Sequence, residues 1–457
     1  MTEQEKAVRE QREFYETGIT REVSYRRAAL GILADGIRRR EGELLAALQE
    51  DLGKPACESY MTEIGLVLSE IRFLRRHLGG WSRPRRVWGA LSQLPGCGTV
   101  APEPYGTALV LSPWNYPIQL SLIPLAEAMA AGNCVTLKPS EQAPACCKAL
   151  RSLLEELFEP CYVRVAEGDA GESEALTRAG FDTIFFTGSP AVGRRVMAAA
   201  AGTLTPVTLE LGGKSPCIVT KDADLSLAAR RIVWGKLLCS GQTCVAPDYI
   251  LADREIKGPL VRELIRWTRE FEGEDPLANR DLTRIVSLRH FDRLTELARG
   301  QKPLLAGRAD RDSLRMSLTI LDEPAESSPV MEEEIFGPVL PVISFETLEE
   351  AAHRVERGTH PLAVYVFTKD PKRAKKLMGR LTFGGGCVND TVLHLASHRM
   401  PFGGVGASGM GSCHGEAGFW AFCRAKSVLW QRRRPDIGLR YRPYTPKKLD
   451  VLRKLMH

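Results

Sequence analysis

Long hydrophobic runs are absent from the 457-residue sequence: no stretch approaches about 18 uninterrupted apolar residues, the length that predicts a membrane-spanning helix. Residues 1–6 are polar and lead into an amphipathic pattern, unlike the basic and then apolar start of a signal peptide. Residues 453–457 form neither a hydrophobic tail nor a prenylation signal. We therefore expect no membrane anchor and a cytoplasmic protein.

Cysteine spacings typical of zinc sites are missing too. Twelve cysteines are present, yet no two of them form a C-x-x-C pair. We therefore predict no metal site, and we expect free thiols in a reducing compartment, most of them buried as small apolar side chains. A cysteine with a chemical role must be identified by its surroundings.

Charge of one sign is also scarce, because 62 basic residues are offset by 56 acidic ones and the net charge is only +6. Short basic clusters occur at 38–40, 72–86 and 432–434, but acidic residues are interspersed through most of the chain. Such clusters are typical of solvated helix faces and subunit contacts, so no nucleic-acid partner is predicted.

A regular alternation of apolar runs and helix-length segments is present, in a chain long enough for two or three domains. Residues 1–80 follow a helical pattern, Trp, Pro and Gly interrupt it in 81–105, and 214–415 mixes helices and strands less regularly. Between 106 and 211 the alternation predicts a parallel sheet covered by helices. Its predicted strands are 107–111, 134–137, 162–166, 183–186 and 207–211, and its predicted helices are 119–131, 144–158, 171–179 and 190–201.

Residues 186–193, Phe-Thr-Gly-Ser-Pro-Ala-Val-Gly, join a predicted strand to a predicted helix. Ser189 can cap this helix, and Gly188 lets the backbone approach an anionic ligand held by the free N–H groups at the helix N-terminus. The pattern differs from the G-x-G-x-x-G dinucleotide fingerprint, and an ordinary tight turn is the alternative interpretation.

Three polar residues follow strands at the edge where parallel sheets bind ligands. Lys138 ends a predicted strand, and Glu141 lies where a carboxylate can accept hydrogen bonds from ribose hydroxyls; a surface ion pair is the alternative. Asn115 lies between two prolines and can donate to an oxyanion, although a turn asparagine that bonds its own backbone is equally common.

Cys244 and Glu210 are the candidates for covalent and acid–base chemistry. Cys244 follows Ser-Gly-Gln-Thr, a flexible approach that gives a thiol the access a nucleophile needs, and no histidine pairs with it as in a thiol protease. Glu210 lies in an apolar strand end, where burial raises the pKa of a carboxylate and suits a general base acting on water. A salt-bridged glutamate is the structural alternative.

Taken in order, four motifs closely resemble the aldehyde dehydrogenase superfamily: residues 186–193, Leu-Glu-Leu-Gly-Gly-Lys at 209–214, Gly-Gln-Thr-Cys at 241–244 and Glu-Ile-Phe-Gly-Pro at 334–338. The resemblance covers nearly the whole chain. The short N-terminus and the segments 113–117, 244–249 and 401–411 are similar to the class 3 branch of this superfamily.

The resemblance implies that Cys244 attacks the aldehyde carbonyl, that Asn115 and the Cys244 N–H hold the oxyanion, and that Glu210 activates the water that hydrolyses the thioester. It implies NAD as the cofactor, with NADP also accepted. The cofactor-binding residues that it implies are Trp114, Lys138, Glu141, Gly188, Ser189, Val192, Gly193, Glu334 and Phe336.

The resemblance also implies an α/β fold with a Rossmann-like parallel-sheet cofactor domain, an α/β catalytic domain and a small oligomerisation element that joins a homodimer. The expected boundaries are 1–80 and 106–210 for the cofactor domain, 211–415 for the catalytic domain, 81–105 and 416–445 for the oligomerisation element, and 446–457 for a basic tail.

The resemblance suggests a medium- or long-chain aliphatic or an aromatic aldehyde as the substrate, because no charged substrate clamp is evident. A CoA-acylating aldehyde dehydrogenase is one alternative, although transfer to a thiol needs no base such as Glu210. A catalytically inactive structural homologue is another, against which the joint presence of Cys244, Glu210, Asn115 and Glu334 argues.

Overall fold

The computed structural model describes residues 1–88, 93 and 96–456. Its N-terminal part is helical, because apolar residues recur on one face of each long helix. Thr2 and Glu5 form a capping box at the first helix, and Gly53 ends the third in a left-handed conformation. The elements are α1 (Glu3–Glu16), η1 (Ile19–Arg21), α2 (Val23–Arg39), α3 (Glu41–Leu52), α4 (Ala56–Ser59), the π-helical turn η2 (Tyr60–Ile64) and α5 (Gly65–Trp81).

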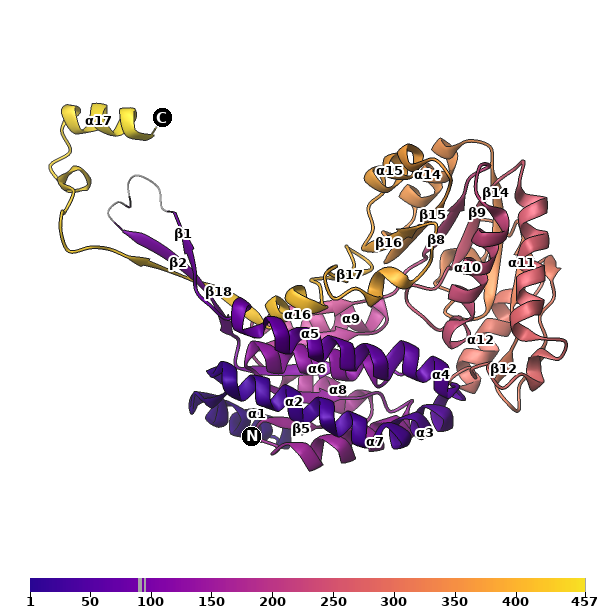
Figure 1. The fold of residues 1–457 in the computed structure, drawn as a ribbon, viewed down its shortest axis with the longest axis horizontal. Helices are drawn as coiled ribbons and strands as arrows, with labels where there is room; N and C mark the ends of the chain where they lie inside the picture. Colours follow the sequence, from indigo (N-terminus) through magenta and orange to yellow (C-terminus); the bar gives the residue numbers. More distant parts are fainter. Residues whose placement is uncertain (89–92, 94–95, 457) are drawn as a thin grey trace.

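A sheet of strand order β17-β7-β6-β3-β4-β5 lies next to these helices (Figure 1). Its strands run parallel except β17, and each bound that the sequence predicts differs from the observed one by at most one residue, which confirms the α/β fold class. The strands are β3 (Thr107–Leu111), β4 (Cys134–Lys138), β5 (Val163–Val165), β6 (Thr183–Thr187) and β7 (Val207–Glu210), joined by α6 (Gln119–Ala131), α7 (Pro144–Leu157), α8 (Ala170–Arg178) and α9 (Pro190–Ala201).

The edge strand β17 (Gly409–Met410) is an addition that the sequence does not predict. Its two residues pair antiparallel with Leu209 and Glu210 at the end of β7. Two residues within a Gly-rich segment show no alternation of apolar and polar positions, so no strand signal arises there.

Helix α6 is central to the first half of the molecule, because it packs against α2, α5 and α16 (Gly415–Ala421). Nearly all of its side chains are buried, as in a helix that is apolar on every face. The short segment between β3 and α6 carries Trp114 and Asn115, so the packing of α6 fixes the backbone of both residues.

The second half of the chain contains another largely parallel sheet, of order β10-β13-β14-β9-β8-β15-β16, in which β10 is antiparallel to β13. The sequence analysis expected a less regular mixture here, since long connections separate these strands. The strands are β8 (Pro216–Val219), β9 (Tyr249–Asp253), β10 (Pro303–Leu305), β13 (Thr319–Asp322), β14 (Val339–Phe345), β15 (Ala363–Phe367) and β16 (Gly385–Val388).

Helices cover this second sheet and small elements connect its strands (Figure 1). The helices are α10 (Leu225–Leu237), α11 (Lys257–Glu272), α12 (Leu288–Ala298), α13 (Pro329–Glu332), α14 (Leu348–Arg357) and α15 (Pro371–Arg380). The smaller elements are the 3-10 turns η4 (Leu238–Gly241), η5 (Pro276–Ala278) and η6 (Leu393–Ala396) and the paired strands β11 (Ala309–Asp310) and β12 (Arg315–Met316).

A third sheet projects from the body as an arm (Figure 1). It consists of β1 (Arg85–Val87), β2 (Cys97–Pro104) and β18 (Cys423–Trp430), which pair antiparallel, and the chain continues through η7 (Gly438–Arg440) to α17 (Pro446–Met456). This arm contains most of the two segments for which the sequence predicts an oligomerisation element, and the chain after it contains the predicted basic tail; residues 416–421 lie instead in α16, which packs against α6. Residues 89–92, 94–95 and 457 of those segments lie outside the described residues.

No helix in the described part of the chain is both long and apolar enough to cross a membrane. The described residues likewise contain no group of three or more His, Cys, Asp or Glu side chains placed to hold a metal ion.

Candidate active site

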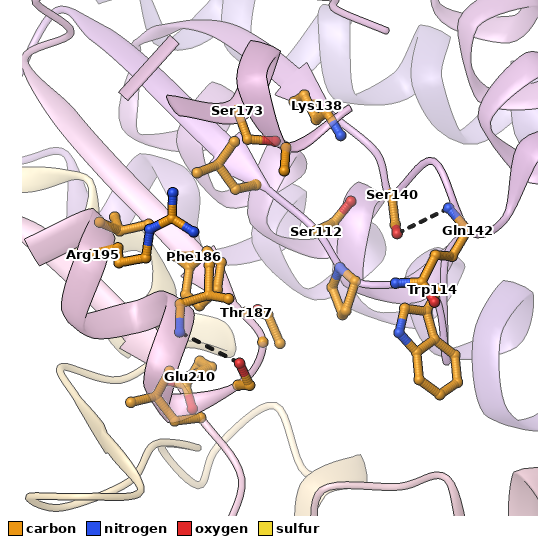
Figure 2. A pocket seen from close by; sticks show the side chains of 18 of the residues that line it. Ser112, Trp114, Lys138, Ser140, Gln142, Ser173, Phe186, Thr187, Arg195 and Glu210 are labelled. Atoms are coloured by element: carbon orange, nitrogen blue, oxygen red, sulfur yellow. Dashed lines mark hydrogen bonds between the residues drawn. The ribbon is translucent and has the colours of Figure 1, made fainter. Parts of the chain in front are cut away.

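A cavity of about 730 Å³ lies at the carboxyl ends of β3, β4, β6 and β7, where open parallel sheets bind ligands. Residues that follow α10, begin α12 and precede β14 close it from the other half of the molecule. Figure 2 shows Lys138 and Ser173 at the top of this pocket, Arg195 at its left and Glu210 below. The cavity brings together nearly all of the residues that the sequence selects: Trp114, Asn115, Lys138, Glu141, Gly188, Ser189, Val192, Glu210, Cys244, Glu334 and Phe336.

Cys244 lies partly exposed at the wall of this cavity, at the end of a strained loop. Cys239 and Ser240 both have a φ of +50°, and Gly241 has a φ of +75°, where a Cβ would overlap the carbonyl of Gly337. Left-handed conformations at three successive residues persist only when the surroundings determine them. The interpretation of this approach as flexible is therefore wrong.

Gln242 fixes the same loop from inside the protein. It is fully buried, and its amide nitrogen donates to the carbonyl oxygens of Cys239 and Arg284, both at 3.0 Å. Its amide oxygen accepts from the N–H of Val286 at 3.0 Å. Since every polar atom of the side chain has a partner, the loop before Cys244 is held in one arrangement.

The thiol of Cys244 resists ionisation. Burial, followed by the carboxylates of Glu334 and Glu210, raises the pKa of Cys244 to about 12. Cysteine attacks carbonyl carbon as the thiolate, so this thiol needs a nearby positive charge or a base before it can react.

Glu210 ends β7 with its side chain only 4% exposed, and neither of its carboxylate oxygens has a hydrogen-bond partner in the structure. Burial raises the pKa of Glu210 well above its ordinary value, although the neighbouring Cys413 thiol opposes that shift. No salt bridge holds it among the described residues, so the structural alternative of a salt-bridged strand-end glutamate is not what the structure shows. A carboxylate of raised pKa facing a cavity is the arrangement expected of a general base.

Glu334 extends over the Gly-rich turn that follows β7. A Cβ at Gly212 would overlap its carboxylate, so the Glu334 side chain lies directly against this glycine. Burial, together with the charge of Asp248, raises the pKa of Glu334 to about 8, and its Oε1 atom is buried without a partner. The free oxygen can accept a hydrogen bond from a hydroxyl group of a ligand in the cavity.

Asn115 and the nucleophile loop are in direct contact. The Asn115 amide Nδ2 donates to the carbonyl of Gln242 at 2.9 Å, and the side chain is only 3% exposed. The alternative of a turn asparagine bonded to its own backbone is therefore not observed. The second hydrogen of the Asn115 amide takes no part in this bond.

Lys138 and Glu141 form an ion pair at the end of β4, with 2.8 Å between Lys138 Nζ and Glu141 Oε2. Lys138 is buried and Glu141 is half exposed. Partial burial alone would raise the pKa of Glu141, but the hydrogen bond from Lys138 lowers it, so the carboxylate stays charged. Lys138 and Glu141 therefore form the ion pair that was the alternative interpretation of the sequence. They also both line the cavity, where a ligand can contact them.

The N-terminus of α9 faces the same cavity. Ser189 caps this helix by accepting from the N–H of Val192 at 3.4 Å, and Pro190 is its first residue. At Gly188 a Cβ would lie 2.6 Å from the Phe186 ring, so a larger residue does not fit the turn. The free N–H groups of this first turn are suited to an anion.

Gly193 is the one selected residue that does not line the cavity. It is buried in α9, where a Cβ would lie 2.7 Å from Leu211 Cδ2. The structure therefore places this glycine at a close packing contact between α9 and the chain after β7, and not at the ligand surface.

The sequence analysis missed several residues that line the cavity. Ser173 and Thr177 on α8 face Arg195 and Ala199 on α9, and each pair is spaced four residues apart, on one face of its helix. A spacing of four residues is visible in the sequence, but many helices show it. It indicates a cavity wall only once α8 is known to pack against α9.

His290 is another missed residue. Its ring lies 5.2 Å from the ring of Trp114, which also contacts Phe336 at 5.4 Å, centroid to centroid. Burial, followed by the charges of Arg293 and Arg289, lowers the pKa of His290 to about 4, so the ring is neutral near pH 7. No motif in the sequence marks this residue.

Comparison with known proteins gives one consistent picture. The model of the aldehyde dehydrogenase family matches residues 2–428. The aldehyde dehydrogenase family 3 member H1 of Arabidopsis thaliana is 42% identical over 454 residues, covering 98% of this chain and 94% of that protein. The predicted resemblance to the class 3 branch is thereby confirmed.

Solved structures agree with this result. The substrate-bound state of Staphylococcus aureus AldH has a TM-score of 0.97 and 39% sequence identity, and the match covers 100% of both chains. An indole-3-acetaldehyde dehydrogenase in complex with NAD⁺ has a TM-score of 0.85 and 26% identity, covering 93% of this chain and 88% of that one.

Proposed function

The chain belongs to the aldehyde dehydrogenase family, and from this premise we propose that it oxidises an aldehyde to the carboxylic acid through a thioester on Cys244, with NAD as the electron acceptor. The observation that carries the proposal is the shared cavity: an accessible thiol and a buried carboxylate without hydrogen bonds face the same space. No salt bridge within the described part of the chain holds either group in place.

The cavity suits a nicotinamide dinucleotide. The α9 N-terminus would hold the pyrophosphate, Lys138 and Glu141 the adenosine ribose, and the unpartnered oxygen of Glu334 the nicotinamide ribose. Trp114 and Phe336, whose rings meet edge to face, would contact the nicotinamide. When bound, the oxidised cofactor accepts a hydride from the substrate carbon and carries positive charge near the thiol.

Acylation begins at Cys244. Its thiolate attacks the aldehyde carbonyl, and the oxygen of the thiohemiacetal takes the negative charge. Asn115 Nδ2 and the Cys244 N–H donate to this oxygen, and the carbonyl re-forms as the hydride leaves, giving the thioester. Burial raises the pKa of this thiol, so a positively charged cofactor bound in the cavity would help to form the thiolate.

Deacylation uses Glu210. Its carboxylate takes a proton from water, the hydroxide attacks the thioester carbonyl, and the Cys244 thiolate leaves as the acid forms. The raised pKa of Glu210 makes it a stronger base than an exposed glutamate, provided that it enters this step ionised. Its position at the end of β7 keeps it at the cavity wall.

A direct test compares the wild type with Cys244→Ala. Mixing wild type with NAD and a medium-chain or aromatic aldehyde should raise absorbance from NADH, and Cys244→Ala should give no NADH while it still binds NAD by fluorescence titration. The rival thiol Cys239 is fully buried. Substantial turnover by Cys244→Ala would mean that another cysteine is the nucleophile.

The two alternatives predict different results in the same assay. A CoA-acylating enzyme would need CoA for turnover, and an inactive structural homologue would give no NADH with any aldehyde. Glu210 favours hydrolysis over transfer to CoA, because water needs a base and a thiol does not.

Cofactor preference, substrate class and assembly extend the proposal. Glu141 disfavours the 2′-phosphate of NADP while Lys138 attracts it, so NAD is preferred without exclusion of NADP. Aliphatic or aromatic aldehydes of medium or long chain are the proposed substrates. The chain would act as a homodimer joined by the arm of β1, β2 and β18, in a reducing, cytoplasmic environment where its twelve cysteines stay free thiols.

A further inference from the structure

A cluster of buried polar side chains lies behind Asn115, centred on Lys54, a residue that does not line the cavity. The Lys54 ammonium has no exposed surface. It pairs with Glu63 Oε1 at 2.6 Å, donates to the Asn115 carbonyl at 3.1 Å and lies 4.1 Å from the centre of the Tyr116 ring. A buried charge is tolerated only with such partners, so the position of the ammonium is fully determined.

Glu63 links this ammonium to the start of α6. Its second oxygen accepts from the N–H groups of Ile118 at 2.8 Å and Gln119 at 3.2 Å. Helix α6 has no side-chain cap of its own at Ile118, so the carboxylate supplies one from a distant segment. Lys54 and Glu63 together therefore fix the backbone from Asn115 to Gln119.

The same cluster reaches the loop that carries the nucleophile. The Cys239 thiol donates to the Asn115 carbonyl at 3.3 Å, and Glu58 accepts from the Cys239 N–H at 2.7 Å. The hydroxyl groups of Tyr116 and Thr243 are 2.6 Å apart, and Thr243 directly precedes the nucleophile. The carbonyl of Asn115 is thus shared by a lysine from one side and the nucleophile loop from the other.

Electrostatics keep the lysine charged in this place. Burial alone would lower the pKa of Lys54, but the carboxylates of Glu63 and Glu58 raise it above its ordinary value. A compact ammonium can satisfy a carboxylate, a carbonyl and a ring together, whereas the planar guanidinium of arginine has another shape and more donors to satisfy. The site is therefore specific for lysine.

We propose that Lys54 is a positioning residue of the aldehyde oxidation: by holding the backbone of Asn115 against the loop of residues 239–244, it sets the spacing between the oxyanion donor and the reacting sulfur. This inference rests on the proposed function, since it takes Asn115 as the oxyanion donor. Displacement of a catalytic group by about 1 Å costs about 100-fold in rate, so a contact with the backbone of the donor residue itself has a large effect.

The test is a double-mutant cycle with Lys54→Met and Asn115→Ala. Methionine keeps the apolar stem and removes the donor. Lys54→Met should lower kcat about 10- to 100-fold and leave the dissociation constant of NAD unchanged. In the Asn115→Ala background, Lys54→Met should cost nothing further, because the donor that it positions is already gone.

The matched control is Lys236→Met, the same substitution at an equally buried lysine of α10. Whatever the fold-loss in kcat from Lys236→Met, the double variant with Asn115→Ala should show the product of the two separate losses. If the losses from Lys54→Met and Asn115→Ala also multiply, Lys54 is only structural and the inference is overturned.

Two further outcomes separate this inference from the proposed function. If Asn115→Ala alone costs nothing, the oxyanion role of Asn115 is wrong and the inference falls with it. If Lys54→Met does not fold, the variant Lys54→Met with Glu63→Gln removes both members of the ion pair, and the amide oxygen can still accept from Ile118. The same double-mutant cycle on that variant then tests the inference, which is overturned if its loss in kcat multiplies with that of Asn115→Ala.

Discussion

At the scale of single residues, the cavity is notable for groups that resist ionisation. Burial raises the pKa values of Cys244, Glu210 and Glu334, and the first two must be in their charged forms, or become so, to act as proposed. The ionisation of such groups, which lack paired charges, depends on the ligand that binds in the cavity. A ligand with one positive charge would favour the ionised form of all three together.

The role of Glu210 is tested by Glu210→Gln. The amide cannot take a proton from water, so the thioester should form at a normal rate and then hydrolyse slowly. Stopped-flow absorbance should show a burst of about one NADH per site, followed by a steady rate at least about 100-fold below that of the wild type. An unchanged steady rate would show that water is activated elsewhere.

The pH dependence of Cys244 follows from its raised pKa. Only the thiolate is alkylated, so below about pH 12 the rate should rise with pH, and at pH 8 Cys244 should react more slowly than an ordinary exposed cysteine. Glu334→Gln removes a carboxylate that raises this pKa, and should speed alkylation by less than about tenfold, because burial is the larger cause. Iodoacetamide labelling of Cys244 followed by mass spectrometry measures both rates, and slower labelling in Glu334→Gln would contradict the assignment.

At the scale of elements, the carboxyl end of β4 decides the cofactor preference. Glu141→Gln removes the charge that repels a 2′-phosphate and frees Lys138 to attract it. We expect kcat/KM for NADP to rise relative to NAD by about tenfold, with the order of preference among aldehydes unchanged. A constant cofactor ratio would show that Glu141 does not face the ribose.

Elements also show how far the sequence predicts this fold. Strands β3 to β7 were predictable because short apolar runs alternate with helices of ordinary length, and the polar residues that follow them had to meet at one sheet edge. Strand β17 and the second parallel sheet were not predictable, since two residues or widely separated strands carry no local pattern. Those pairings depend on contacts distant in sequence.

The same contrast holds within the site. Asn115, Lys138, Glu210 and Cys244 were selected from local context and the structure places them around one cavity. Lys54 gave no signal, since its partners lie 9 and 61 residues away along the chain. A residue that acts through buried partners is recognisable only after folding brings them together.

At the scale of the whole molecule, the projecting arm leaves apolar surface in solvent. Leu429 and Trp430 on β18 are 46% and 64% exposed, which is typical of a surface covered by a second subunit. Light scattering should give about twice the chain mass of 50.5 kDa.

The arm's part in this assembly is tested by Leu429→Asp, which should shift the protein toward the monomer mass. Ile32→Asp is its matched control, because Ile32 on α2 is equally exposed, at 47%, and lies away from the arm. If both variants keep the mass of the wild type, or lose it alike, the arm does not join the subunits.

The π-helical turn η2 has a consequence for chain length. Glu58 and Glu63 both reach the cluster behind Asn115, although side chains five residues apart on an α-helix diverge by about 140°. The wider π turn brings them back into phase by accommodating one extra residue. A chain shortened by one residue between 58 and 63 would place the two carboxylates four residues apart on an ordinary α-helix, about 40° from each other, so both would still face the cluster without a π turn.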